Sequence, residues 1–334
     1  MKNRNIFLLL VMLLIPGLSG QALAGGGFKK YAGEFMYLGA GARGTSLGGA
    51  YGALVNDASA SYWNPAALSE VNGFQLQFMN SKQFISSIQT NYLAVSHPYD
   101  DGAVIGLSLY FLTVNNIQNT ASAGVFDQTT LELVGLDESK IRSFNTGDYI
   151  LSASYSRRWN KQLSWGATLK MLYRDFDFTT AAGMGLDIGL LYRVRGLRLS
   201  AVARDITGTL IAWNSGEKQW VSPTIGLGAA WPLVMESLSL TVSPTVGAQF
   251  MGEGRNFAAQ ASMGPFSADF MAGLEINYND VISIRTGMDA LQRLNAGIGL
   301  KLPHISFDYA FTAYANELGN IHRINFNLAI DPLF

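Results

Sequence analysis

The stretch that decides the fold is Leu-Ser-Trp-Gly-Ala-Thr-Leu-Lys-Met-Leu-Tyr-Arg-Asp, residues 163–175. Its odd-numbered positions up to 173 carry Leu, Trp, Ala, Leu, Met and Tyr, and its even-numbered positions carry Ser, Gly, Thr, Lys, Leu and Arg. A period of two residues puts one set on each face of a β-strand. One face is apolar and the other is mostly polar, so the pattern predicts a strand that faces two different solvents.

The same alternation recurs from residue 73 to the end of the chain. It predicts an all-β protein of about fourteen strands. We place them at 73–81, 88–97, 103–113, 147–158, 163–175, 183–193, 197–206, 221–231, 237–250, 266–277, 281–288, 293–302, 304–313 and 321–330.

The connections between these strands alternate in length. Those after even-numbered strands are short, and the longer ones, such as 114–146, 207–220 and 251–265, follow odd-numbered strands. Short periplasmic turns and longer extracellular loops are typical of outer-membrane barrels, whose tilted strands need about 9–11 residues to cross the bilayer. The sequence therefore predicts a transmembrane antiparallel β-barrel, because a closed sheet leaves no unpaired edge in lipid.

Composition agrees with a lipid-facing surface. Charged residues make up 14% and hydrophobic residues 49% of the chain, whereas globular proteins average about 25% charged residues. The net charge of −1 and the lack of a Lys/Arg cluster argue against a nucleic-acid partner. There is no cysteine, and His97, His304 and His322 lack metal-ligand spacing. We expect no metal, no cofactor and no enzymatic activity, although some outer-membrane barrels are lipases or proteases.

The first residues predict export. A positive start, an apolar run over 6–15 and Ala22-Leu23-Ala24 form a secretory signal peptide over residues 1–24. Residues 25–71 then form an N-terminal plug, or hatch, in the barrel lumen, and residues 72–334 form the barrel. The terminal Phe334, which closes an alternating last strand, looks like a recognition signal for the barrel assembly machinery.

The plug prediction rests on a glycine-rich stretch without a period. Residues 39–44 match G-x-G-x-x-G, but residues 34–38 before them make a poor buried strand and residues 45–49 after them a poor helix start, so we reject a dinucleotide site. Glycines instead allow positive φ and close backbone packing. Asn64 and Pro65 form a capped helical turn, and Asp57 and Asn64 are candidates for tying the plug to cations of the lumen. The plug motif comprises Gly39, Gly41, Arg43, Gly44, Gly48, Gly49, Asp57, Asn64 and Pro65.

The inward face of the predicted barrel is polar, with both signs of charge. These charges either pair with one another and with the plug or attract an anionic head group. Some residues on the inward face are apolar, which predicts that part of the lumen is hydrophobic. Among these candidates are Leu93, Val95, Leu191 and Val202. The lumen-facing charged candidates are Lys170, Arg174, Asp187, Arg198, Arg204, Asp269, Glu275 and Arg285.

The connection 114–146 is longer than most loops of folded domains. It begins with a polar stretch, and residues 130–136 are suited to a short amphipathic piece. Two interpretations of this connection remain open: a lid or partner-binding surface, or an unstructured surface loop.

At two places the chain resembles a known family. Gly-Ala-Arg-Gly-Thr-Ser-Leu-Gly-Gly-Ala-Tyr-Gly-Ala-Leu (41–54) and Asn-Asp-Ala-Ser-Ala-Ser-Tyr-Trp-Asn-Pro-Ala-Ala-Leu (56–68) resemble the N-terminal signature of the PorV/PorQ family, within the wider FadL-like group. Residues 307–311, with Leu318-Gly319 and His322-Arg323, resemble its last two strands. The resemblance implies a barrel of about fourteen strands in the bacterial outer membrane, with the N-terminal segment inside.

Two functions follow from this resemblance. PorV-like members bind secreted proteins of the type IX system and pass them on, and this is the function that the signature favours. FadL-like members are passive channels for long-chain fatty acids or other hydrophobic compounds. The expected partners are therefore outer-membrane lipid, the barrel assembly machinery, and either secreted protein cargo or a hydrophobic small molecule.

Overall fold

The computed structural model describes residues 33–83, 87–100, 102–127, 130, 132–252, 259–314 and 319–330. The predicted signal peptide and Phe334 lie outside the described residues.

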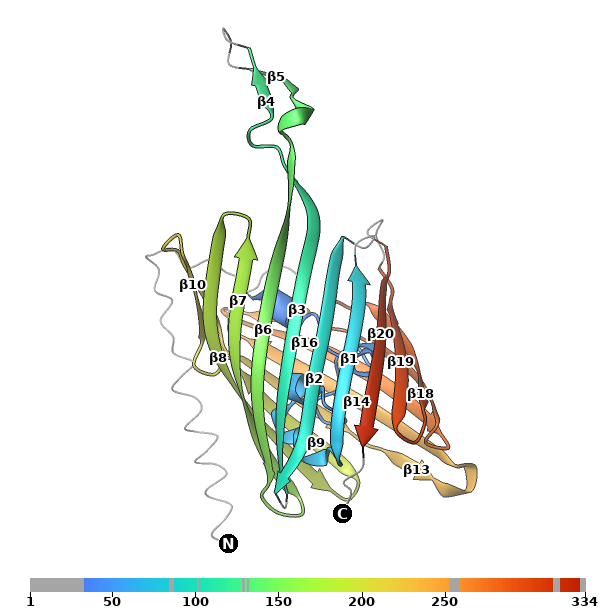
Figure 1. Cartoon of the computed structure of the whole chain (residues 1–334). Coiled ribbons are helices and arrows are strands. Elements are labelled where there is room, and N and C mark those ends of the chain that lie inside the picture. The colour runs from blue at the N-terminus through green and yellow to red at the C-terminus, as the bar shows by residue number, and fades with distance from the viewer. Residues whose placement is uncertain are drawn as a thin grey trace.

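The wall of the molecule is one 18-stranded antiparallel sheet that closes on itself (Figure 1). Closure comes from the first and last strands, which pair from Phe74↔Ile330 to Lys82↔His322. The strands are β1 Phe74–Gln83, β2 Ile88–Asp100, β3 Ala103–Asn119, β6 Arg142–Arg158, β7 Leu163–Phe176, β8 Thr179–Val194, β9 Leu197–Arg204, β10 Thr209–Trp213, β11 Lys218–Val221, β12 Thr224–Ala230, β13 Leu233–Met235, β14 Leu240–Met251, β15 Ala261–Met263, β16 Phe266–Tyr278, β17 Ile282–Met288, β18 Leu294–Lys301, β19 Ile305–Thr312 and β20 Ile321–Ile330.

These segments make a closed barrel of 14 strands. Strands β9 and β10 follow one another along β8, and β11 and β12 likewise form one wall strand, while β13 and β15 are short additions to β14 and β16. The predicted fold class is confirmed. No helix among the described residues has the length and apolar character to cross a membrane.

Alternation along each strand separates the two faces of the wall. On β7, Met171 is 50% exposed, whereas its neighbours Lys170 and Leu172 are 8% and 3% exposed. The predicted faces of β2 are wrong: Leu93 is 40% exposed and points outward, whereas Tyr92 lies inside and is 1% exposed. Val95 shares the outward face of Leu93. Strand β2 has apolar residues on both faces, so its alternation alone does not say which face is inside.

The prediction of a loop from residue 114 to 146 is also wrong in part. Strands β3 and β6 stay paired up to Asn119↔Arg142. Their hairpin rises well beyond the barrel rim and ends in a small ribbon of β4, Gly124–Phe126, and β5, Leu133–Leu136 (Figure 1). A 3₁₀ turn, η4 Glu138–Lys140, follows the ribbon.

Residues 33–73, which we call the luminal segment, lie inside the barrel (Figure 1). They form η2 Glu34–Tyr37, α2 Ala42–Ser46, α3 Ala60–Trp63 and η3 Pro65–Glu70, all short. Side chains such as Leu47, Tyr51 and Leu68 are fully buried. Apolar residues of the segment and of the inner wall form two shared clusters, so the hydrophobic core lies between segment and wall.

Wall glycines make this close packing possible. A Cβ at Gly273 or Gly287 would come within 3.0 Å of the backbone of Leu47, and one at Gly166 within 3.0 Å of the backbone of Pro65. Because these glycines sit on β7, β16 and β17, the segment is wedged against several sides of the barrel.

A last 3₁₀ turn, η5 Glu236–Leu238, lies between β13 and β14.

Candidate functional site

A chain of ion pairs holds α2 against the wall. Both oxygens of Glu275 on β16 accept hydrogen bonds from Arg43 of α2, each at 2.7 Å. Glu275 also accepts one at 2.7 Å from Arg285 on β17, and Arg285 donates to Asp308 on β19 at 2.7 Å. Bidentate arginine–carboxylate pairs are strong and directional, so this chain fixes the position of α2.

Asn64 and Asp57 bond differently from the prediction. The Asn64 amide donates to the carbonyls of Gly52 at 3.0 Å and Leu190 at 3.2 Å, and its oxygen caps η3. Asp57 accepts from the Tyr51 hydroxyl at 2.8 Å, within the luminal segment. Among the described residues neither has a cation as its hydrogen-bond partner, and the charged links to the wall run through Arg43 and Glu70 instead.

The glycines of the plug motif lie at points of close approach or have a positive φ. A Cβ at Gly44 would lie 2.7 Å from the rings of Trp63 and Tyr51. Gly48 meets the backbone of Met288, and its φ of +66° also favours glycine. Positive φ at Gly39, Gly41 and Gly49 likewise explains why the chain has glycine there, and Pro65 begins η3.

The other predicted luminal charges fall into separate groups. Lys170 lies between Asp187 at 2.7 Å and Asp205 at 2.8 Å. Arg174 pairs with Asp148. Three aromatic rings, those of Phe35, Phe176 and Trp213, surround the Arg174 guanidinium, with centroids 4.9–5.4 Å away.

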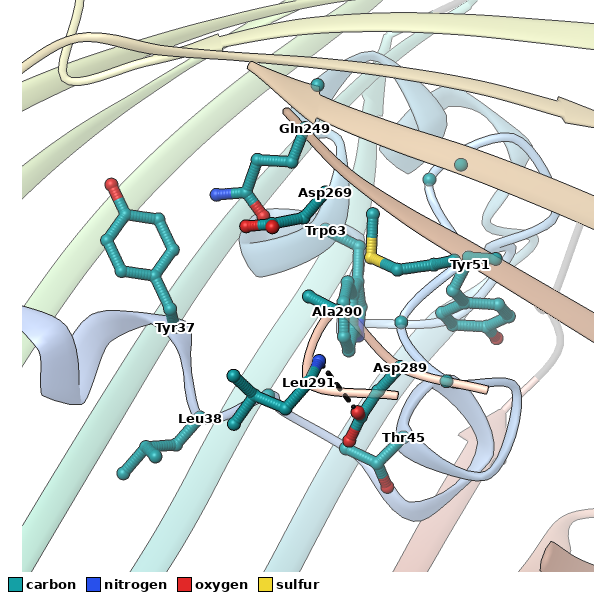
Figure 2. Close-up of a pocket in the computed structure, with 18 of the residues that line it drawn as sticks. Tyr37, Leu38, Thr45, Tyr51, Trp63, Gln249, Asp269, Asp289, Ala290 and Leu291 are labelled. Atoms are coloured by element: carbon teal, nitrogen blue, oxygen red, sulfur yellow. Dashed lines mark hydrogen bonds between the residues drawn. The ribbon is translucent and has the colours of Figure 1, made fainter. Parts of the chain in front are cut away.

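A cavity of about 620 Å³ lies between the luminal segment and the wall. It runs from the turn between β17 and β18, residues 289–293, down to Gly52 and Ser200, along β9, β12 and β14. Figure 2 shows Tyr37, Leu38 and Leu291 grouped on one side of the labelled lining residues. The Leu291 amide donates to Asp289 at 3.0 Å and so shapes this turn.

The lining is mainly apolar and aromatic, with Leu38, Trp63 and Met271 among its residues. Tyr37 lies within hydrogen-bond distance of the Thr224 hydroxyl, at 3.2 Å. Burial raises the pKa of the Tyr37 phenol well above its ordinary value, so this group is neutral at physiological pH. On the wall side of the cavity, Gly226 leaves open space, because a Cβ there would have no heavy atom closer than 3.9 Å.

Two of the arginines that line the cavity bind backbone carbonyls of the luminal segment. Arg323 on β20, only 3% exposed, donates to the Thr312 hydroxyl at 2.9 Å and to the Leu38 carbonyl at 3.4 Å. Arg204 donates to the Trp63 carbonyl at 3.2 Å. The cavity also contains the predicted Asp269, whereas Arg198 lies below its floor at the short-turn end of the barrel.

Several lining residues were absent from the predicted site, among them Tyr37, Trp63 and Gly226. Their pattern in sequence is that of ordinary core or turn residues. Other lining residues did carry a signal, because Gln249, Asn295 and Arg323 lie on the predicted polar faces of their strands. The described residues contain no group of three His, Cys, Asp or Glu that could hold a metal ion.

The sequence matches no family model and no curated protein. Solved structures do resemble the fold. The toluene transporter TodX of P. putida aligns with a TM-score of 0.54 and 10% identity, over 88% of this chain and 99% of that chain. A FadL homologue of Pseudomonas aeruginosa aligns with a TM-score of 0.53 and 12% identity, over 86% and 98%. At this identity the likeness establishes a shared barrel fold.

Proposed function

We propose that this chain is a non-enzymatic outer-membrane channel for small hydrophobic compounds, in which the luminal segment is the plug and the cavity is the cargo site. The observation that carries the proposal is the cavity itself. Its volume of about 620 Å³ lies within the range of about 300–1,000 Å³ that ligand pockets occupy. Ligand pockets are usually lined by apolar and aromatic side chains with polar groups among them, and this lining combines residues such as Leu38, Trp63 and Met271 with charged ones such as Arg204 and Arg323.

The outer surface supports a membrane location. Large apolar side chains point outward from strands all around the wall, while charged and hydroxyl side chains point inward. This is the distribution that a barrel in lipid requires. With the predicted signal peptide, it supports the bacterial outer membrane as location, and lipid and the barrel assembly machinery as partners.

The two solved structures of similar fold add a coarse indication of cargo. One is described as a toluene transporter and the other as a FadL homologue. Both descriptions agree with transport of hydrophobic molecules, and the aromatic residues Tyr37 and Trp63 around the present cavity suit a flat or extended apolar ligand.

The test fills the cavity without disturbing the wall. Gly226→Trp places a ring into open space, whereas Ala272→Trp, on the outward face of β16, is a matched control. Both proteins are reconstituted into liposomes, and entry of a hydrophobic fluorescent dye is followed. We expect Gly226→Trp to abolish protein-dependent entry and Ala272→Trp to retain it. Equal entry in both variants contradicts the assignment of the cavity.

A second candidate function, the handling of secreted protein cargo as in type IX secretion, is favoured by the ribbon beyond the rim. Its residues Val125, Phe126, Leu133, Val134 and Leu136 are all exposed. An exposed two-stranded ribbon with apolar side chains suits a protein partner better than water. Replacing these five residues with Ser should remove co-purifying secreted proteins while dye entry persists. If no secreted protein co-purifies with the unaltered chain, this candidate is rejected.

A further inference from the structure

At the short-turn end of the barrel, three arginines converge on one carboxylate. Arg158 ends β6, Arg193 lies near the end of β8, and Arg198 lies near the start of β9. Their shared partner is Glu70, the last residue of η3, where the luminal segment leaves the lumen. Arg193 pairs closely with Glu70, Arg198 approaches it at 3.3 Å, and Arg158 at 3.8 Å.

The arrangement leaves excess positive charge around Glu70, in a partly buried place that opens to solvent at Arg158, whose side chain is 47% exposed. Arg193 and Arg198 are directly opposite one another across β8 and β9, a placement that is unfavourable for like charges. Their side chains are only 19% and 16% exposed. Among the described ion pairs, Glu70 is the one carboxylate that these three arginines share, so two positive charges stay unbalanced.

Hydrogen bonding is incomplete as well. Arg193 donates to the Ser164 hydroxyl at 2.9 Å, and Arg158 to the Ser69 carbonyl at 2.9 Å. By contrast, the buried Nε and one terminal nitrogen of Arg198 have no hydrogen-bond partner within the part of the chain that the structure describes. The 3.3 Å approach to Glu70 is an ion pair without hydrogen-bond geometry. Buried donors of a guanidinium ordinarily find an acceptor, and oxyanions fit its planar fork best.

We propose that Arg158, Arg193 and Arg198 form a binding site for an oxyanion, a carboxylate or a phosphate group. The site lies just beyond the floor of the cavity. On β9 the inward residues Arg204, Val202 and Ser200 line the cavity, and Arg198 follows two residues further along the same face. If the proposed function holds, an acidic cargo molecule leaving the lumen would meet these arginines.

The primary test measures inorganic phosphate binding to the full chain in a zwitterionic detergent by calorimetry, with sodium chloride at matched ionic strength as reference. We expect saturable binding that Arg198→Met weakens at least about tenfold, because a charge-assisted hydrogen bond is lost. Arg142→Met is the matched control, since that arginine is exposed and pairs with Asp177 at the opposite end. Heat-modifiable migration checks that each variant is folded.

Glu70→Gln separates an anion site from a purely structural cluster. An anion site loses its competing carboxylate and binds phosphate more tightly, whereas a structural cluster only loses stability. Absence of saturable binding to both the unaltered chain and Glu70→Gln overturns the proposal, as does an affinity of Arg198→Met equal to that of Arg142→Met.

Two further ligands identify the source of the anion. Tighter binding of hexanoate than of acetate assigns the site to the acid group of a cargo molecule, and equal binding assigns it to free anions. Both results support an oxyanion site. Phosphate binding to Gly226→Trp tests the site apart from transport, because that substitution lies above the cavity floor. If dye entry never depends on the cavity but phosphate still binds, the proposed function fails and the anion site stands.

Discussion

Substitution of Arg43 by Met should loosen the luminal segment without opening the barrel wall. Arg43 makes two hydrogen bonds to Glu275 and one to Asn56 at 2.6 Å. Its side chain is 21% exposed, and that of Glu275 is 5% exposed.

The magnitude follows from what the substitution leaves behind. Breaking a buried ion pair costs about 3–5 kcal/mol when the remaining charge is isolated. Glu275 keeps Arg285 as a partner, so the loss is nearer that of hydrogen bonds to a charged group, about 1.5–3 kcal/mol. We take about 2 kcal/mol for this partly exposed pair, which is about a 30-fold change in an opening equilibrium.

Hydrogen–deuterium exchange of the full chain in detergent measures this opening. Amides of residues 42–51 should exchange about 30-fold faster in Arg43→Met, while amides in β6 and β7 keep their protection. Arg142→Met removes an exposed arginine that pairs with Asp177 at the opposite end of the barrel; it is the control and should change exchange in the segment less than about twofold. An increase in exchange below about threefold in Arg43→Met, or an equal increase in the control, refutes the idea that the Arg43–Glu275 pair holds the luminal segment in place.

Three other predictions follow from the same structure. Burial raises the pKa of the Tyr51 and Tyr62 phenols, so their contribution to stability is present below about pH 10 and is lost above it, by about 1.4 kcal/mol per pH unit for each tyrosine. In an alkaline titration, phenolate absorbance should therefore rise together with release of the luminal segment. Titration of both phenols near pH 10, without release of the segment, would contradict this. Gly287→Val should displace the luminal segment and make it sensitive to protease, because the valine side chain would overlap the backbone of Leu47, whereas Gly226→Val should be tolerated. Equal protease sensitivity of the two variants would be evidence against the packing of the segment on the wall. Deletion of residues 28–60 should raise permeability in liposomes while heat-modifiable migration persists, since the wall closes through its own hydrogen bonds; unchanged permeability would reject the plug.

The strands of the wall were predictable from sequence because each strand's pattern depends only on the environments on its own two faces. A strand between lipid and a polar lumen must alternate, and the alternation marks nearly every strand. Within the wall the predicted faces of β2 were wrong, and the predicted strand ends failed where the strands no longer lie between lipid and lumen. Beyond the rim both faces of the β3–β6 hairpin meet water, so residues 114–119 pair as a strand without an apolar face.

The inside of the barrel was less predictable. The charge at Glu275 was assigned to the lumen from its place on the polar face, but its partner Arg43 is 232 residues away in sequence. No spacing rule links such residues, because closure of the barrel brings them together. The floor of the cavity between Gly52 and Ser200 arises in the same way, from a segment and a wall strand that meet only in the closed barrel.

The sequence by itself determined the closed, lipid-facing barrel and a glycine-rich segment that cannot form part of its wall. The two-residue period and the length of each strand follow from the two environments that the strand faces, so the sequence of a single strand shows that it belongs to such a barrel. The alternation of short and long connections adds the orientation of the strands. Only the tertiary structure decided which luminal charges pair, where the segment leaves a cavity, and that three arginines meet at Glu70. Those features depend on side chains from distant strands, and their positions are set by the register of the whole closed sheet.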